Sequence, residues 1–152
     1  MASVKAEAII APQSGSSVTG TATFVGENGK VTLTLNIAGA VPGERAVHIH
    51  EMGDCSMDGM GAMGHWNPDM QDHGKWGVGE FHLGDIGNIT IGSDGKGTLT
   101  MSTDLWSIGD GSGWFHVVGR ALMVHAEADD FVTQPTGNAG ARVGCGVITK
   151  VP

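Results

Sequence analysis

Short segments in which apolar and polar residues alternate recur along the chain and predict β-strands. The clearest is TATFVGENGKVTLTLNI, residues 21–37, which has two alternating runs on either side of Asn28-Gly29. Because successive side chains of a strand point to opposite faces, every second residue of the second run shares one face. An Asn-Gly pair between two such runs is a strong signal for a two-residue β-hairpin, which we expect here. The shared face of its second strand carries Val31, Leu33, Leu35 and Ile37.

The same alternation predicts further strands elsewhere in the chain. The segment NITIGSDGKGTLTMS, residues 88–102, repeats the hairpin pattern around Asp94-Gly95. Additional strands are expected at residues 4–11, 46–50 and 117–125, and no segment shows apolar periodicity of helical length. Short strands separated by turn signals are typical of antiparallel sandwiches and barrels, so we predict an all-β fold.

Two long stretches, about residues 51–84 and 126–141, lack any strand pattern. Long segments without secondary structure are uncommon inside a compact domain and are usually functional or disordered. The chain has 152 residues, which fits a single domain over residues 1–152. We therefore expect two long functional loops within one domain.

Charge and hydropathy exclude several classes of partner. Eight Lys and Arg residues stand against 16 Asp and Glu residues, a formal net charge of −8, so no basic patch for nucleic acid is expected. No apolar run reaches the roughly 18 residues of a membrane-spanning helix. The first ten residues, MASVKAEAII, also lack the charged start and long apolar stretch of a secretory signal.

The two cysteines, Cys55 and Cys145, allow two interpretations. They form one long-range disulfide in an oxidising compartment, or they are two buried thiols in the cytosol, where disulfides are rare. The sequence pattern around them favours neither.

Several histidines lie where metal ligands would be expected. His48 and His50 are two residues apart on a predicted strand, so both side chains share a face. By itself this pair is more typical of solvent-facing histidines on an edge strand. The loop that follows is more informative, because it supplies three histidines and an aspartate. Their spacing is His65-x7-His73-x8-His82-x2-Asp85.

Imidazole nitrogens and a carboxylate are ligands that zinc accepts, usually four in a tetrahedron. Four polar residues on a solvated loop are the alternative for this set. His125 ends an apolar strand. His116 lies an odd number of positions earlier, so on a regular strand its side chain would point to the opposite face from that of His125. We therefore expect His116 at the surface beside Trp114 and Phe115. Without His116, six histidines and one aspartate remain, one ligand short of two separate four-ligand sites. A shared ligand would close that gap.

The chain resembles the copper/zinc superoxide dismutase family in five separated segments. They are HIHEMGDC, GHWNPDMQDHG, FHLGDIGN, GRALMVHAEADD and TGNAGARVGCGVI. The resemblance implies a flattened, eight-stranded Greek-key β-barrel, an immunoglobulin-like sandwich architecture. It also implies one copper and one zinc ion per chain.

Carried over to this sequence, the resemblance implies a role for each candidate residue. The copper ligands would be His48, His50, His65 and His125. The zinc ligands would be His65, His73, His82 and Asp85. His65 would then bridge both metals as an imidazolate, and Asp129 would hydrogen-bond His48 and His73 from outside the ligand sets. Cys55 and Cys145 would form a disulfide, which favours a periplasmic or extracellular location over a cytoplasmic one.

The implied reaction is the dismutation of superoxide, with copper as electron carrier, His65 as proton carrier and Arg142 orienting the anion opposite Thr136. A homodimer and a copper donor are the implied partners. The loop at 126–141 contains Glu127, Asp129 and Asp130 but no Lys or Arg, so guidance by basic residues of that loop is not expected.

The same residues fit other classes of function less well. A copper chaperone or a zinc-stabilised binding module would not require the full copper set plus Arg142. A zinc hydrolase using Glu51 or Glu80 as base would need an open zinc position, which four protein ligands close.

A further hypothesis concerns four methionines, which would capture copper because thioethers favour Cu(I), with flexible loop packing as the alternative. These are Met52, Met57, Met60 and Met63.

Overall fold

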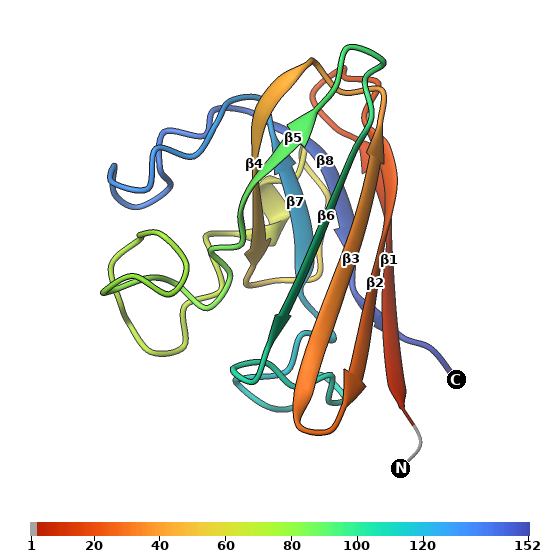
Figure 1. Cartoon of the computed structure of the whole chain (residues 1–152), viewed down its shortest axis with the longest axis vertical. Helices are drawn as coiled ribbons and strands as arrows, with labels where there is room; N and C mark the ends of the chain where they lie inside the picture. Colours follow the sequence, from red (N-terminus) through yellow and green to blue (C-terminus); the bar gives the residue numbers. More distant parts are fainter. Residues whose placement is uncertain (1–2) are drawn as a thin grey trace.

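The protein is built almost entirely of antiparallel strands in a computed structural model that describes residues 3–152 (Figure 1). One short 3₁₀ helix, η1 (Met60–Ala62), is the only helix among these residues. The strands are β1 (Val4–Pro12), β2 (Thr19–Glu27), β3 (Lys30–Ala38), β4 (Gly43–His50), β5 (Gly87–Ile91), β6 (Gly97–Thr103), β7 (Ala121–His125), β8 (Arg142–Val147) and β9 (Thr149–Lys150). None of the described residues forms a helix long and apolar enough to cross a membrane.

Eight strands form one sheet that curls into a nearly closed barrel. Their order is β5-β4-β7-β8-β1-β2-β3-β6, and the two-residue strand β9 adds a pairing to β1. The two ends of this order, β5 and β6, are consecutive in the chain and meet at a turn in which the Gly92 amide donates to the Lys96 carbonyl at 2.9 Å. The predicted eight-stranded Greek-key barrel is therefore confirmed.

The hairpin predicted at Asn28-Gly29 is confirmed in register and in turn geometry. Glu27 pairs with Lys30, and the two turn residues have φ angles of 54° and 78°, as a type I′ turn requires. The alternating apolar residues of β3 are buried and face the strands across the barrel. These two strands and β1 thus form one wall of the core.

Two predicted elements differ from the structure. The hairpin expected around Asp94-Gly95 does not form a ladder within residues 3–152. Instead, β5 pairs with β4 and β6 pairs with β3. The strand expected at residues 117–125 is shorter, since β7 begins at Ala121 and residues 117–120 form the end of a loop. The preceding glycine-rich segment, with Gly109 and Gly119 at positive φ, bends the chain where a strand would have to run straight.

The two long loops leave the same side of the barrel (Figure 1). The yellow-green segment around residues 65–85 and the blue segment at 126–141 both project beside β4, β5 and β7. A disulfide joins Cys55, in the first loop, to Cys145 of β8. The barrel therefore serves as a rigid base from which both loops are presented together.

Candidate metal centre

Three of the predicted copper ligands are positioned by two paired strands. His48 and His50 lie on β4 and His125 ends β7, which is the neighbour of β4 in the sheet. All three are at most 3% exposed, so the expectation of solvent-facing histidines on an edge strand is wrong. The Nε2 atoms of His50 and His125 lie 3.4 Å apart.

His65 joins these histidines from the long loop. The chain pairs locally with β4 at this point, because the Trp66 amide donates to the Ile49 carbonyl at 2.9 Å and His65 forms a β-bridge with His50. The four histidines form what we call the histidine quartet, and each offers a ring nitrogen within 4.8 Å of the others. Its members are His48, His50, His65 and His125.

A second cluster surrounds one oxygen of Asp85. Its Oδ1 lies 2.9 Å from Nδ1 of His65, 2.9 Å from Nδ1 of His73 and 3.4 Å from Nδ1 of His82. The Nδ1 atoms of His65 and His82 are 3.0 Å apart. Tetrahedral zinc with bonds of about 2.0–2.1 Å separates its ligand atoms by about 3.3 Å, so these four atoms fit a zinc ion.

The polar atoms left without partners support metal binding in both clusters. His48 Nδ1, His65 Nε2 and His73 Nδ1 are buried and have no hydrogen-bond partner. His73 Nδ1 is close to Asp85 Oδ1 in distance, but the angle is not that of a hydrogen bond. Buried polar atoms are normally paired, and lone pairs that converge without hydrogen bonds are the arrangement a bound cation requires.

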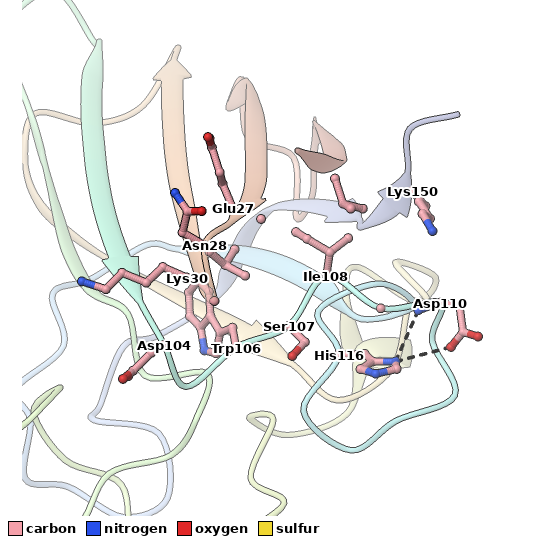
Figure 2. A pocket seen from close by; sticks show the side chains of 15 residues that line it. Glu27, Asn28, Lys30, Asp104, Trp106, Ser107, Ile108, Asp110, His116 and Lys150 are labelled. Carbon is pink, nitrogen blue, oxygen red and sulfur yellow. Dashed lines mark hydrogen bonds and ion pairs between the residues drawn. The ribbon is translucent and has the colours of Figure 1, made fainter. Parts of the chain in front are cut away.

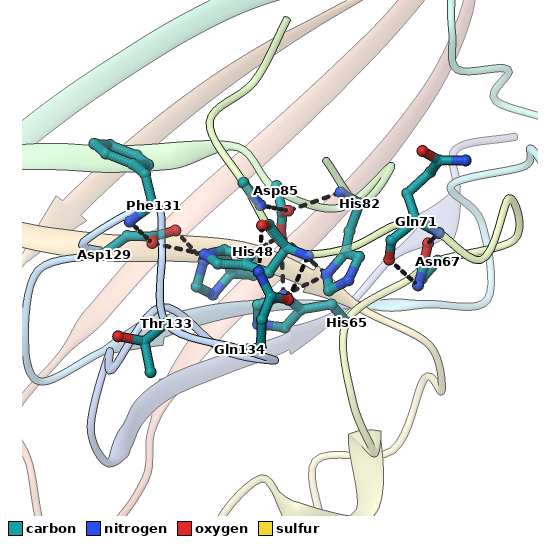
Figure 3. A network of polar contacts seen from close by, with 12 residues as sticks. His48, His65, Asn67, Gln71, His82, Asp85, Asp129, Phe131, Thr133 and Gln134 are labelled. Atoms are coloured by element: carbon teal, nitrogen blue, oxygen red, sulfur yellow. Dashed lines mark hydrogen bonds and ion pairs between the residues drawn. The ribbon is translucent and has the colours of Figure 1, made fainter. Parts of the chain in front are cut away.

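The loop backbone orients Asp85 toward the three imidazoles. Its second oxygen, Oδ2, accepts hydrogen bonds from the amides of His82 at 2.7 Å and Gly74 at 3.1 Å. Figure 3 shows Asp85 between His48, His65 and His82, with these contacts drawn. Because Oδ2 is held by the backbone, Oδ1 is left free to face the ring nitrogens.

Asp129 connects the two clusters from the other loop. Its Oδ2 lies 2.7 Å from Nε2 of His48, and its Oδ1 lies 2.7 Å from Nε2 of His73. A carboxylate accepts, so both imidazoles donate from Nε2 and keep the Nδ1 lone pair for a metal. Asp129 is itself buried, and its amide donates to Asn88 Oδ1 at 2.8 Å. This is the contact pattern that the resemblance implied for Asp129.

The protonation equilibria suit cation binding at neutral pH. Burial lowers the pKa of His65 to about 4 despite its hydrogen bond to Asp85, and burial likewise lowers the pKa values of His50 and His125. Burial alone would raise the pKa of Asp85, but the three imidazoles in contact with its carboxylate hold that pKa well below its usual range. Neutral imidazoles and a charged carboxylate are the forms that bind metals.

His73 behaves differently because two carboxylates face it. Burial lowers its pKa, but the hydrogen bond to Asp129 and the negative charge of the adjacent Asp85 outweigh burial and raise the pKa of His73 to about 9. In the metal-free protein His73 therefore carries a proton at neutral pH. A metal ion that binds Nδ1 of His73 must displace that proton.

Arg142 begins β8 beside the histidine quartet. Its positive charge contributes to the lowered pKa values of His50 and His125, and its guanidinium donates to the Gly59 carbonyl at 2.8 Å. No carboxylate within residues 3–152 forms an ion pair with it. Thr136 is half-buried in the adjacent loop, and its place on the channel wall stays a prediction.

The structure adds supporting residues that the sequence did not indicate. Gln134 accepts a hydrogen bond from the His73 amide at 2.7 Å and donates one to the His73 carbonyl at 2.8 Å. Asn88 bonds both the amide and the carbonyl of Asp129. Asn88 lies within the segment FHLGDIGN, whereas Gln134 lies outside all five matched segments, so no sequence signal pointed to it.

His116 lies away from both clusters, as predicted, but for a different reason. It lines a shallow cavity of about 590 Å³ at the end of the barrel that holds the β2–β3 turn (Figure 2). Its Nδ1 accepts hydrogen bonds from the amides of Gly113 and Asp110 at 3.0 and 3.3 Å. The parity argument was wrong because residues 117–120 do not form a strand. No residue of either metal cluster lines this cavity.

Comparison with known proteins agrees with the site. The family model for copper/zinc superoxide dismutase matches residues 18–148. A solved structure titled "Crystal Structure Analysis of the clock protein EA4" is similar over 95% of this chain and 93% of that chain, with a TM-score of 0.84 and 35% sequence identity. The family match covers most of the chain and includes every residue of the two clusters. The chain belongs to the copper/zinc superoxide dismutase family.

Proposed function

We propose that this protein is a superoxide dismutase that converts two superoxide anions and two protons into O₂ and hydrogen peroxide. The observation that carries the proposal is the shared ring of His65. Its Nδ1 belongs to the Asp85 cluster, while its buried Nε2 has no hydrogen-bond partner and belongs to the histidine quartet. One imidazole with a free lone pair toward each of two sites supports a bridging ligand.

The two donor sets support different metals. Three imidazole nitrogens and one carboxylate oxygen at tetrahedral spacing suit zinc, which has no redox chemistry. The four imidazoles of the quartet suit copper, which supplies one-electron chemistry by alternating between two oxidation states. We assign one copper and one zinc per chain on this basis.

His65 is the proposed proton carrier. Its Nε2 can hold either a metal or a proton, because both compete for the same lone pair. With zinc bound, Nδ1 and the Asp85 carboxylate would both be held by that ion, so the ring would keep its position when Nε2 changes partner. A proton held at Nε2 is then placed to protonate the departing peroxide.

Arg142 is the proposed anion-binding residue. Its guanidinium is permanently charged and lacks a carboxylate partner among the described residues, so its charge remains available to an anion. The net charge of −8 repels superoxide at long range, and a local positive field must act within about 8 Å, the Debye length at physiological salt. Arg142 supplies that field beside the quartet.

The remaining assignments rest on the disulfide and the family. The Cys55–Cys145 bond supports an oxidising compartment, for which we propose the periplasm or the cell exterior. We also propose a homodimer, as is usual in the family. The similar solved structure is titled a clock protein and its title states no reaction, so the dismutase activity rests on the site and the family match.

The test is the stopped-flow decay of superoxide by protein loaded with one copper and one zinc per chain. We expect fast decay that slows as salt is added, because screening weakens the attraction by Arg142. His125→Ala should abolish the decay, and His116→Ala, which changes a histidine outside both clusters, should leave it intact. Decay no faster than that of His125→Ala would contradict the proposal and favour a copper-binding role.

A further inference from the structure

Four methionines in the loop between β4 and His65 face the solvent. Met52, Met57, Met60 and Met63 are exposed by 50, 74, 58 and 60%, respectively. Thioethers that face water cannot fill gaps in a core, so loop packing does not explain these residues. Their position in the first long loop requires another account.

Backbone hydrogen bonds fold the segment that carries these methionines into tight turns. The Met60 amide donates to the Met57 carbonyl and the Met63 amide to the Met60 carbonyl, each at 3.1 Å, so residues three apart are joined by tight turns. The Met52 amide donates to the Ala62 carbonyl at 3.1 Å, which places Met52 beside the last turn. We call residues 51–64 the methionine loop.

The methionine loop contacts both the quartet and Arg142. The Met63 carbonyl lies 2.8 Å from Nδ1 of His50 and so fixes that ring with Nε2 toward the quartet. The Gly59 carbonyl accepts the hydrogen bond from Arg142 at 2.8 Å. The exposed thioethers are therefore carried by a segment that touches the proposed copper site directly.

The chemistry of this loop favours a soft cation of low charge. Thioether sulfur is a soft ligand that suits Cu(I). The loop itself contains no Lys or Arg; Glu51 forms an ion pair with Arg120 at 3.3 Å, so the exposed Asp54 and Asp58 supply its negative charge. Copper is thus the ion that both the sulfur atoms and the neighbouring quartet select.

We propose that Met52, Met57, Met60 and Met63 form a Cu(I) site that receives copper and passes it to the histidine quartet. The transfer replaces thioether ligands with imidazole nitrogens and leaves the oxidation state unchanged, so it needs no oxidant or reductant. The proposal rests on the proposed function only in taking the quartet as the copper site.

Binding is tested with zinc-loaded, copper-free protein carrying ¹³C-methyl methionine, titrated with Ag(I) as a redox-inert substitute for Cu(I). We expect the methyl signals of the four loop methionines to shift, also in a His125→Ala background. Met70 is the matched control, because it is 88% exposed but lies outside the methionine loop, and its signal should not move. Unchanged signals for the four loop methionines would overturn the site.

Delivery is tested by the rate at which the same protein takes copper from a Cu(I)–chelator complex. A variant with M52L, M57L, M60L and M63L should load more slowly, by roughly tenfold or more, because a local copper reservoir is lost. M70L should load at the normal rate. Leucine is close to methionine in volume, and thermal unfolding checks that the fold is kept.

Equal loading rates in the two variants would overturn the proposal. Neither measurement uses superoxide, so failure of the dismutase assay is separable from failure of this site. A protein that loads copper through the methionines but leaves superoxide untouched would overturn the proposed function and retain the Cu(I) site.

Discussion

At the scale of single residues, Asp129 contacts one imidazole from each proposed ligand set and holds both rings in orientation. Asp129→Asn preserves the size of the side chain but removes its charge and half of its accepting capacity. We expect zinc affinity to fall about 10- to 100-fold, the usual cost of losing such an outer partner. Competition with a zinc chelator at fixed pH measures this change.

Asp130→Asn is the matched control for that prediction. Asp130 is exposed, and its carboxylate bonds only residues of its own loop, the amides of Val132 and Thr133 among them. Its replacement should leave zinc affinity unchanged. If the two variants bound zinc equally well, Asp129 would have no part in orienting the histidines.

Gln134 acts on the backbone of His73 rather than on its ring. Its amide pairs with both the N–H and the C=O of that residue, as a neighbouring strand would. In Gln134→Ala both bonds are lost, so hydrogen exchange at the His73 amide should accelerate roughly five- to tenfold. Gln134→Glu keeps the accepting oxygen, so its exchange rate at the His73 amide should lie between those of the wild-type protein and Gln134→Ala. An unaltered exchange rate in Gln134→Ala would show that the bond contributes nothing in solution.

At the scale of elements, the disulfide fixes the methionine loop to β8. Cys55 lies in the loop, while Cys145 pairs with Met123 of β7 and Ala11 of β1 in the middle of the sheet. Replacing both cysteines with serine should lower the free energy of unfolding of the metal-free protein by roughly 2–5 kcal/mol. Urea unfolding under non-reducing conditions measures it. Reducing the wild-type protein should produce a comparable loss, and identical transition midpoints would refute the prediction.

The elements that local pattern predicts well are those whose partner is adjacent in the chain. The β2–β3 hairpin is of this kind, since Asn28 and Gly29 specify its turn. The segments flanking Asp94-Gly95 carry the same pattern, yet β5 and β6 separate beyond the turn because each has a different long-range partner. A turn signal predicts where the chain reverses but not which strands form a ladder.

The site shows the same division between local and long-range information. The count of histidines left room for one shared ligand, and the family resemblance assigned the two ligand sets whose residues the structure brings together. Which ring nitrogen faces which set depends on Asp129, Asp85 and the Met63 carbonyl, all distant in sequence from the rings they orient. The family resemblance implied the contacts of Asp129, whereas the contact of the Met63 carbonyl with His50 follows from the path of the loop and had no signal in the sequence.

At the scale of the whole molecule, the metal-free protein buries titratable groups whose pKa values depart from those of the unfolded chain. Burial lowers the pKa values of His50, His65 and His125, so the folded protein excludes protons that the unfolded chain accepts below about pH 6.5. Its stability should therefore fall as the pH falls from about 6.5 toward 4. The shift of the His65 pKa to about 4 alone corresponds to a loss on the order of 3 kcal/mol.

His73 has the opposite effect on the pH dependence of stability, because its contribution is lost at alkaline pH. Its pKa is raised to about 9, since the hydrogen bond to Asp129 and the charge of Asp85 outweigh burial, so the folded state holds a proton that the unfolded chain has released. That stabilisation is complete below about pH 6.5 and is lost as the pH rises through 9. Urea unfolding of metal-free protein between pH 4.5 and 9.5 should therefore give a maximum near neutrality. Metal-loaded protein should vary less over this range, because bound ions fix the protonation of the same rings. If the free energy of unfolding of the metal-free protein rose as the pH was lowered from 6.5 to 4.5, these histidines would be solvated in the absence of metal.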